Sequence, residues 1–266
     1  MIQFYRTTSI FVLLLATFCL STSKLHAQEL MVAVASNFST VMYDLMKDFE
    51  KIDKSKVILI TGSSGKLYAQ IKQGAPFDVL LSADQDKPTR LINEGIAVPN
   101  SQFTYATGSL VLWSAHEGLI RGDEGVLISS SFNKLALANS KLAPYGLAAE
   151  QVLTKLGLEK KTRLSWVQGE NISQAYQFVA SGNADLGFVA KSQVWANNQL
   201  IKGSVWLIPT DLYEPIKQDA VIIKSTRNIE LAKKLMNFLQ SKSIQEKIEK
   251  FGYQSYLEPV NNIQGL

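Results

Sequence analysis

Histidine and cysteine are almost absent from this chain of 266 residues, which contains two histidines and one cysteine. His26 and Cys19 both lie near the N-terminus, so His116 is the only histidine in the rest of the sequence. There is also no G-x-S-x-G elbow, no H-E-x-x-H motif and no metal-binding spacing of His and Cys. These absences exclude thiol enzymes, disulfide-rich scaffolds and zinc sites. A hydrolase would have to use Ser64 as its nucleophile and rely on His116 alone as its base.

The N-terminus lacks acidic residues and has the layout of a secretory signal peptide. Arg6 precedes an almost wholly apolar run over residues 10–20, and Ala27 ends a segment that suits cleavage. The run is shorter than the roughly 20 residues that span a bilayer. Cys19 is not preceded by the small residues of a lipid-attachment site, so it is interpreted as part of the run. We therefore expect cleavage near Ala27, with residues 1–27 as the signal peptide, and a periplasmic location.

The chain also has little excess charge once that segment is removed. Arg6 and Lys24 leave with residues 1–27 and no acidic residue does, so the formal net charge falls from +4 to +2. No basic run with interleaved aromatic residues is present, which argues against a nucleic acid partner. The remaining chain is long enough to form one large or two small domains.

Short apolar runs alternate with amphipathic helical segments, a pattern typical of an α/β fold with mostly parallel sheets. Continuous apolar runs such as 57–60 and 79–81 indicate strands that are buried on both faces. In residues 38–49 the apolar positions follow helical spacing, and residues 229–241 and 243–251 form two further helices. The expected strands are 30–35, 57–61, 78–82, 110–114, 134–138, 163–167, 186–190, 205–208 and 220–224.

The order of these elements suggests two lobes that share the chain, with a ligand cleft between them. Strand 110–114 would carry the chain out of the first lobe, and strand 220–224 would carry it back. The first lobe would then comprise residues 28–110 and 222–266, and the second lobe residues 111–221. Two connections of this kind would allow hinge closure over a ligand.

Four short segments place small or polar residues where an expected helix begins after a strand: 35–38, 62–65, 143–146 and 169–172. The first turn of a helix has unpaired N–H groups and a partial positive charge, which suit an anion. Ser36, Ser64 and Asn171 could each be a simple N-cap. Tyr145 caps a helix poorly but can donate one hydrogen bond into a cleft. If these ends converge, they form a neutral cage for a small oxyanion, which is a binding site rather than a reaction centre.

Five segments carry a family resemblance: residues 32–38 (VAVASNF), 65–71 (GKLYAQI), 74–84 (GAPFDVLLSAD), 184–190 (ADLGFVA) and 213–221 (YEPIKQDAV). In this order they resemble the molybdate-binding proteins of bacterial molybdate ABC importers, over essentially all of the mature chain. The resemblance implies a two-lobed type II periplasmic binding protein fold with the ligand between the lobes. It also implies a membrane permease as partner, with neither catalysis nor a cofactor.

The resemblance further implies which residues bind the oxyanion: Ser36, Asn37, Ser64, Tyr145 and Ile172. Ser36 and Ser64 would act through hydroxyl and backbone groups, and Tyr145 and Ile172 through backbone N–H groups. One branch of the family has a ligand-contacting Tyr where this chain has Ala190. We expect the Asn37 side chain and the Tyr145 hydroxyl to replace that donor. Molybdenum would be bound as molybdate by the same residues, without a direct bond between protein and metal.

Size should govern selection in such a cage. A dianion held by about six or seven hydrogen bonds, each worth roughly 1.5–3 kcal/mol, needs no counter-cation. Molybdate and tungstate are nearly equal in size, whereas sulfate would leave donors unsatisfied. We expect a monomer that captures molybdate and tungstate for an ABC importer. Another tetrahedral oxyanion, such as sulfate or thiosulfate, remains an alternative ligand, and a sensor receptor remains an alternative partner.

Overall fold

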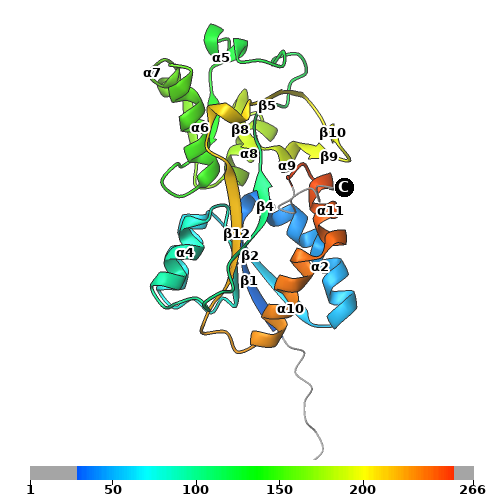
Figure 1. Cartoon of the computed structure of the whole chain (residues 1–266). Coiled ribbons are helices and arrows are strands. Elements are labelled where there is room, and N and C mark those ends of the chain that lie inside the picture. Colours follow the sequence, from blue (N-terminus) through cyan, green and yellow to red (C-terminus); the bar gives the residue numbers. More distant parts are fainter. Residues whose placement is uncertain (1–28, 255–266) are drawn as a thin grey trace, which may run out of the picture.

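The computed structural model describes residues 29–254, which form two lobes, each built on a five-stranded sheet (Figure 1). The first sheet has the strand order β2-β1-β3-β12-β4, and the second has the order β11-β5-β8-β6-β7. The strands are β1 (Glu29–Ala35), β2 (Lys56–Gly62), β3 (Val79–Leu81), β4 (Phe103–Gly108), β5 (Leu110–Ser114), β6 (Leu135–Ala138), β7 (Trp166–Gly169), β8 (Leu186–Ala190), β9 (Trp195–Ala196), β10 (Gln199–Leu200), β11 (Ser204–Leu207) and β12 (Ile216–Ile222).

Helices cover both sheets, so the two-lobed α/β fold expected from the sequence is confirmed. The helices of the first lobe are η1 (Ser36–Phe38), α2 (Ser39–Asp53), α3 (Ser64–Lys72), α4 (Asp86–Asn93), α10 (Ile229–Gln240) and α11 (Lys242–Lys250). Those of the second lobe are α5 (Gly125–Ser129), α6 (Pro144–Lys155), α7 (Glu159–Thr162), η2 (Arg163–Ser165), α8 (Ile172–Ala180) and α9 (Lys191–Val194), and η3 (Thr210–Leu212) precedes β12.

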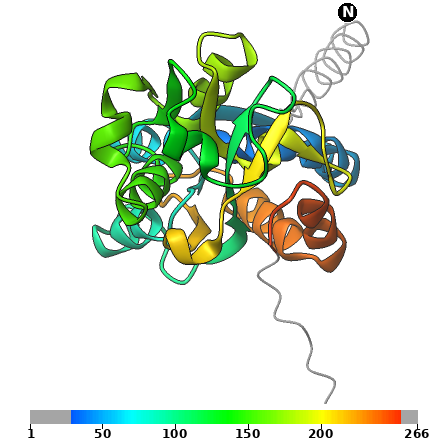
Figure 2. The ribbon, with the colours of Figure 1, turned by 90° about the horizontal axis from the view of Figure 1, so that it is seen from above.

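The core of the first lobe follows from the helical spacing in α2. Val41, Met42, Leu45, Met46 and Phe49 are all buried, as the sequence periodicity predicts. They pack in one cluster with apolar side chains of β1, α10 and α11. The C-terminal helices α10 and α11 lie side by side on one flank of the molecule (Figure 2, orange to red). Helices α10 and α11 therefore belong to the first lobe.

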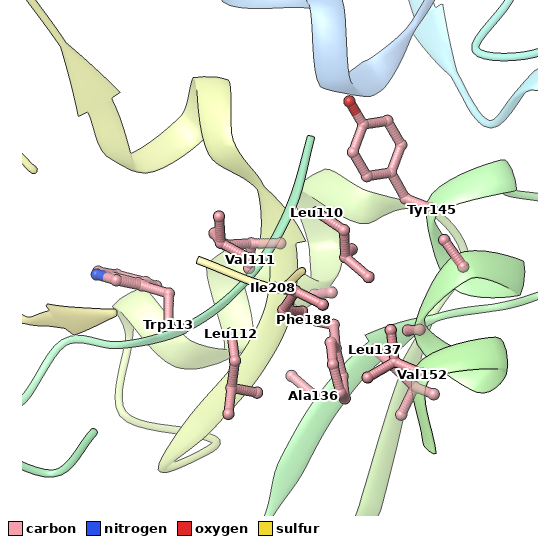
Figure 3. Packing of buried hydrophobic residues seen from close by; sticks show 14 of the residues in the cluster. Leu110, Val111, Leu112, Trp113, Ala136, Leu137, Tyr145, Val152, Phe188 and Ile208 are labelled. Atoms are coloured by element: carbon pink, nitrogen blue, oxygen red, sulfur yellow. The ribbon is translucent and has the colours of Figure 1, made fainter. Parts of the chain in front are cut away.

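The core of the second lobe gathers around β5, β6 and β8. Leu112, Leu137, Phe188 and Val152 are fully buried there, and Val152 comes from α6 (Figure 3). These strands carry the continuous apolar runs that the sequence assigns to doubly buried strands. The sheets are more mixed than expected, because β5 runs antiparallel to both β8 and β11.

The chain passes between the sheets twice. The first passage is at Ser109, between β4 and β5, and agrees with a strand that starts at residue 110. The second passage lies before Ile216, because all of β12 belongs to the first sheet and pairs with β3 and β4. The predicted second-lobe range 111–221 therefore ends too late. The first half of β12 carries polar residues, so it lacks the apolar run that would indicate a buried strand.

Two other local predictions were wrong. Strand β4 was not expected, since Phe103–Gly108 mixes small and hydroxyl residues with two aromatic ones. The strand expected at residues 163–167 begins only at Trp166, because Arg163–Ser165 form a short 3-10 turn. The predicted signal peptide lies outside the described residues. Between residues 29 and 254, no helix has both the length and the apolar character needed to cross a membrane.

Candidate functional site

The four helix starts singled out in the sequence meet where the lobes face each other. The N–H of Gly65 in α3 donates to the carbonyl oxygen of Leu142, just before α6, over 2.9 Å. The Ser173 hydroxyl in α8 donates to the carbonyl oxygen of Ser36 in η1 over 3.1 Å. Each bond joins one lobe to the other, so the structure holds the lobes closed against each other at these helix starts.

In α3, α6 and α8, most N–H groups of the first turn are satisfied inside the protein. In α3 the N–H of Lys66 donates to the hydroxyl of Ser63, and in α8 the Asn171 side chain accepts from the N–H groups of Ser173 and Gln174. Ser64, Tyr145 and Ile172 differ from their neighbours. Across residues 29–254, their backbone N–H groups donate to no acceptor in the protein. The N–H groups of Ser36 and Asn37 in η1 also have no acceptor in that part of the chain, so all five predicted positions offer free backbone donors, spread over the four helix starts.

The Ser64 side chain is not the cap of its helix. Ser63 occupies that position, whereas the buried Ser64 hydroxyl accepts a 2.9 Å hydrogen bond from the N–H of Ala83. A hydroxyl that accepts in this way still has its own hydrogen to donate. Ser36 is also buried, and only its carbonyl oxygen is used, by the hydroxyls of Ser39 and Ser173. Both predicted serines thus keep a hydroxyl donor within the described structure.

Asn37 is placed differently from the prediction of direct ligand contact by its side chain. Its Nδ2 donates to Gln218 Oε1 over 2.8 Å and to the Tyr253 hydroxyl over 3.0 Å. Its carbonyl oxygen accepts from Tyr253 and from Ser192. Because an amide nitrogen has two hydrogens, both are engaged inside the protein. Contact between this amide and a ligand would require one of the bonds to break.

Tyr145 spans the boundary between the second-lobe core and the interface. Its ring packs with the apolar cluster, and its hydroxyl points away from the cluster toward the first lobe (Figure 3). The hydroxyl accepts a 3.2 Å bond from Gln218 Nε2. Burial, with smaller contributions from Tyr253 and Tyr105, holds the pKa of the Tyr145 phenol well above its usual value. The phenol therefore stays neutral near pH 7 and keeps its hydrogen.

Charged groups lie at the rim of this region. Lys66 Nζ is 3.0 Å from Glu170 Oε2, and the pair again joins the two lobes. Residues 29–254 contain no group of three or more His, Cys, Asp or Glu side chains that could hold a metal ion. The donors at the helix starts are neutral, and such a set suits an anion that brings its own charge.

Among the residues that the structure describes, His116, on which the hydrolase alternative depends, is not bonded to the helix starts of the candidate site. The backbone of His116 bonds to Ser114 and Ser204 of the second lobe, and no hydrogen bond within the described chain links it to Ser64. Ala190 is fully buried and has only a methyl side chain, as expected of a position without a donor. Sequence reasoning missed Gln218 and Tyr253, although Gln218 lies within one of the five segments that carry the resemblance.

Comparison with known proteins then identifies the family. Residues 30–254 match the model of the family described as bacterial extracellular solute-binding protein. The chain belongs to this family. Since its members bind solutes, the hydrolase alternative is not supported, and the architecture of this solute-binding protein agrees with that role.

The relatives of this solute-binding protein include two molybdate-binding proteins named ModA. The one from Azotobacter vinelandii is 49% identical over 228 residues, which cover 86% of this chain and 90% of the relative. The one from Rhodobacter capsulatus is 44% identical over 227 residues, which cover 85% of this chain and 88% of the relative. The solved structure of the periplasmic molybdate-binding protein of Azotobacter vinelandii has a TM-score of 0.82 and 42% identity, covering 85% of this chain and 98% of that one.

Proposed function

We propose that this protein binds molybdate, with tungstate as a nearly equal ligand, and delivers it to the membrane permease of an ABC importer. The observation that supports the ligand most strongly is the 49% identity to a molybdate-binding protein across 86% of the chain. The free N–H groups of Ser64, Tyr145 and Ile172 agree with it, because they form a neutral donor set where the lobes meet.

In this proposal the anion lies between η1, α3, α6 and α8. Ser36 and Ser64 donate from their hydroxyls, and Ser64, Tyr145 and Ile172 donate from their backbone N–H groups. Asn37 forms part of the start of η1 that faces the anion, while its side-chain amide stays bonded to Gln218 and Tyr253. The protein needs no cofactor, and molybdenum enters only as the bound oxyanion.

Cavity size decides the choice between anions of equal charge. Donors fixed at helix starts cannot all follow a smaller anion inward, and each donor left without a partner costs about 1–3 kcal/mol. Sulfate and phosphate are smaller than molybdate, so they should bind less tightly than molybdate and tungstate. Sulfate or thiosulfate remains the alternative ligand, and the same cage would then have to be narrower.

Three further parts of the proposal concern the whole protein rather than the site. The mature chain is exported to the periplasm after cleavage near Ala27, as the sequence of the N-terminus predicts. It acts as a monomer, which light scattering of the purified mature protein checks directly. It docks to a permease rather than to a sensor receptor, a choice that transport of labelled molybdate in a strain lacking the protein would test.

A thermal-shift series on the purified mature protein tests the ligand. Molybdate, tungstate, sulfate and phosphate are added at equal concentration, with sodium chloride of matched ionic strength as the control. A ligand at about 100 times its Kd adds roughly 2.7 kcal/mol, which raises the melting temperature by several degrees. We expect shifts with molybdate and tungstate alone. A larger shift with sulfate would replace the proposed ligand, and no shift with any of the four would reject an oxyanion site.

A further inference from the structure

Gln218 is a fully buried polar residue on the strand that leads back into the first lobe. It lies in β12, its relative exposure is 0%, and the pairing of β12 with β4 is irregular between Gln218 and Asp219. A bulge of this kind re-aims side chains locally. A buried amide is costly unless its hydrogen-bonding groups are satisfied. The partners of this amide are therefore informative.

Each side of the Gln218 amide bonds to a residue at the candidate site. Oε1 accepts from Asn37 Nδ2 over 2.8 Å, and it also accepts from the Tyr105 hydroxyl over 3.0 Å. Nε2 donates to the Tyr145 hydroxyl over 3.2 Å. Asn37 belongs to η1 in the first lobe, and Tyr145 belongs to the first turn of α6 in the second. One side chain therefore connects two helix starts that come from different lobes.

There is no spare room around this connection. A Cβ atom placed on Gly108 would lie 2.0 Å from the Tyr145 hydroxyl and 2.5 Å from Gln218 Nε2. Gly108 is the last residue of β4, so the backbone itself packs against the pair. Because Gly108 packs against the Gln218 amide and hydrogen bonds hold it to Asn37, Tyr105 and Tyr145, the amide is fixed in one position.

We propose that Gln218 is a positioning residue for oxyanion binding. By holding Asn37 and Tyr145 at a fixed separation, it sets the distance between the start of η1 and the start of α6, and hence between their backbone donors. Gln218 itself need not touch the anion. This inference rests on the proposed function, since it assumes that both helix starts bind the oxyanion.

The test compares two buried glutamines. Gln245 in α11 is also fully buried, and its Nε2 donates to the backbone carbonyls of Tyr105 and Leu239, in the core of the first lobe. Gln218→Met and Gln245→Met each replace an amide by an unbranched side chain of similar length. Chemical denaturation measures the stability of each ligand-free variant. Calorimetry measures the Kd for molybdate, and stopped-flow tryptophan fluorescence measures the rates of association and dissociation.

We expect both variants to lose stability, but only Gln218→Met to lose affinity. Its Kd for molybdate should rise at least tenfold, mostly through faster dissociation, because the bond to Tyr145 crosses between the lobes. Gln245→Met should keep its Kd within about threefold of the wild-type value. If Gln218 had a purely structural role, both variants would lose stability and both would keep a Kd for molybdate close to the wild-type value. That outcome would overturn the inference.

A second variant covers the case in which Gln218→Met does not fold. Gln218→Glu keeps the shape of the side chain and the acceptor that faces Asn37, but it can no longer donate to Tyr145. It also brings a negative charge close to the anion. We expect a rise in Kd of at least tenfold, and a folded Gln218→Glu protein with wild-type Kd would overturn the inference. If the wild type binds neither molybdate nor tungstate, the proposed function fails instead, and the comparison is repeated with the anion that it does bind.

Discussion

Lys66 Nζ lies 3.0 Å from Glu170 Oε2, and this ion pair joins the first turn of α3 in the first lobe to the segment just before α8 in the second. The Gly65 N–H bonds to Leu142 beside it. Both side chains of the pair remain partly exposed, at 50% and 31%. The pair therefore acts across the rim of the site, where solvent screens it.

Replacing Lys66 by Met should weaken molybdate binding modestly and in a salt-dependent manner. An exposed ion pair is worth about 0.2–1 kcal/mol, so the Kd should rise by up to about fivefold at low ionic strength. The difference from wild type should shrink at high salt. Lys56→Met is the matched control, because the exposed Lys56–Glu29 pair lies within the first lobe. Calorimetry at two salt concentrations measures the Kd for molybdate of the wild type and of both variants. An equal loss in the control, or a loss that salt does not reduce, would contradict the prediction.

Ser64→Ala should lower both stability and affinity, whereas Ser63→Ala should lower stability alone. The Ser64 hydroxyl accepts from the buried N–H of Ala83, and its hydrogen is available for the anion. Its removal leaves that N–H without a partner, at about 1–3 kcal/mol, and also deletes one ligand donor. Ser63 caps α3 by accepting from Lys66, and loss of a cap costs about 0.5–2 kcal/mol.

Urea unfolding and calorimetry separate the two serine variants. We expect the Kd for molybdate to rise at least tenfold in Ser64→Ala and less than threefold in Ser63→Ala. The reverse order would move the oxyanion to the neighbouring serine. A wild-type Kd for molybdate in both variants would mean that neither hydroxyl contacts the ligand.

Gly108→Ala should disturb the site although Gly108 donates nothing to it. The added methyl group would overlap the Tyr145 hydroxyl and crowd Gln218, which must then move. We expect a loss of about 1–3 kcal/mol in stability and weaker molybdate binding. Gly125→Ala is the control, since its methyl group meets only the side chain of Asp123 at the surface. Wild-type binding by a folded Gly108→Ala protein would show that Tyr145 tolerates displacement.

Much of the fold is predictable because its signals are local. The helical spacing of apolar residues in α2 and the apolar runs of β1, β5 and β8 identify buried elements directly. Strand β12 is harder, because its first half carries Lys217, Gln218 and Asp219, and the last two are buried. Their partners come from distant parts of the sequence, so nothing nearby shows that they are satisfied. The boundary of the second lobe was misplaced for that reason.

The site divides in the same way. The sequence indicates the helix starts, since small polar residues after a strand are a local pattern. It does not show which N–H groups remain free, because Gly65 is satisfied by Leu142, a residue from the other lobe. Nor does it show that Tyr253, near the end of the described chain, bonds to Asn37. Contacts between the lobes form because the lobes are closed against each other, and the local sequence does not indicate how the lobes are arranged.

Three buried phenols should make the protein lose stability in alkali. Burial raises the pKa of Tyr105, Tyr145 and Tyr253 above the usual 10.0, and nearby tyrosines add to the effect at Tyr105 and Tyr145. Below pH 10 these phenols are neutral in both the folded and the unfolded chain, so this contribution to stability is intact. Above pH 10 the unfolded chain releases protons that the folded chain retains, and the free energy of unfolding falls.

Each phenol should contribute a slope of up to about 1.4 kcal/mol per pH unit once the unfolded chain is ionised. Urea unfolding between about pH 9 and about pH 11.5, with tyrosinate absorbance as a second signal, measures the slope. Tyr145→Phe should reduce it by the share of one phenol. Tyr43→Phe is the control, because that side chain is 56% exposed on α2, and it should leave the slope unchanged. A slope that Tyr145→Phe does not alter would mean that this phenol ionises in the folded protein as it does in the unfolded chain.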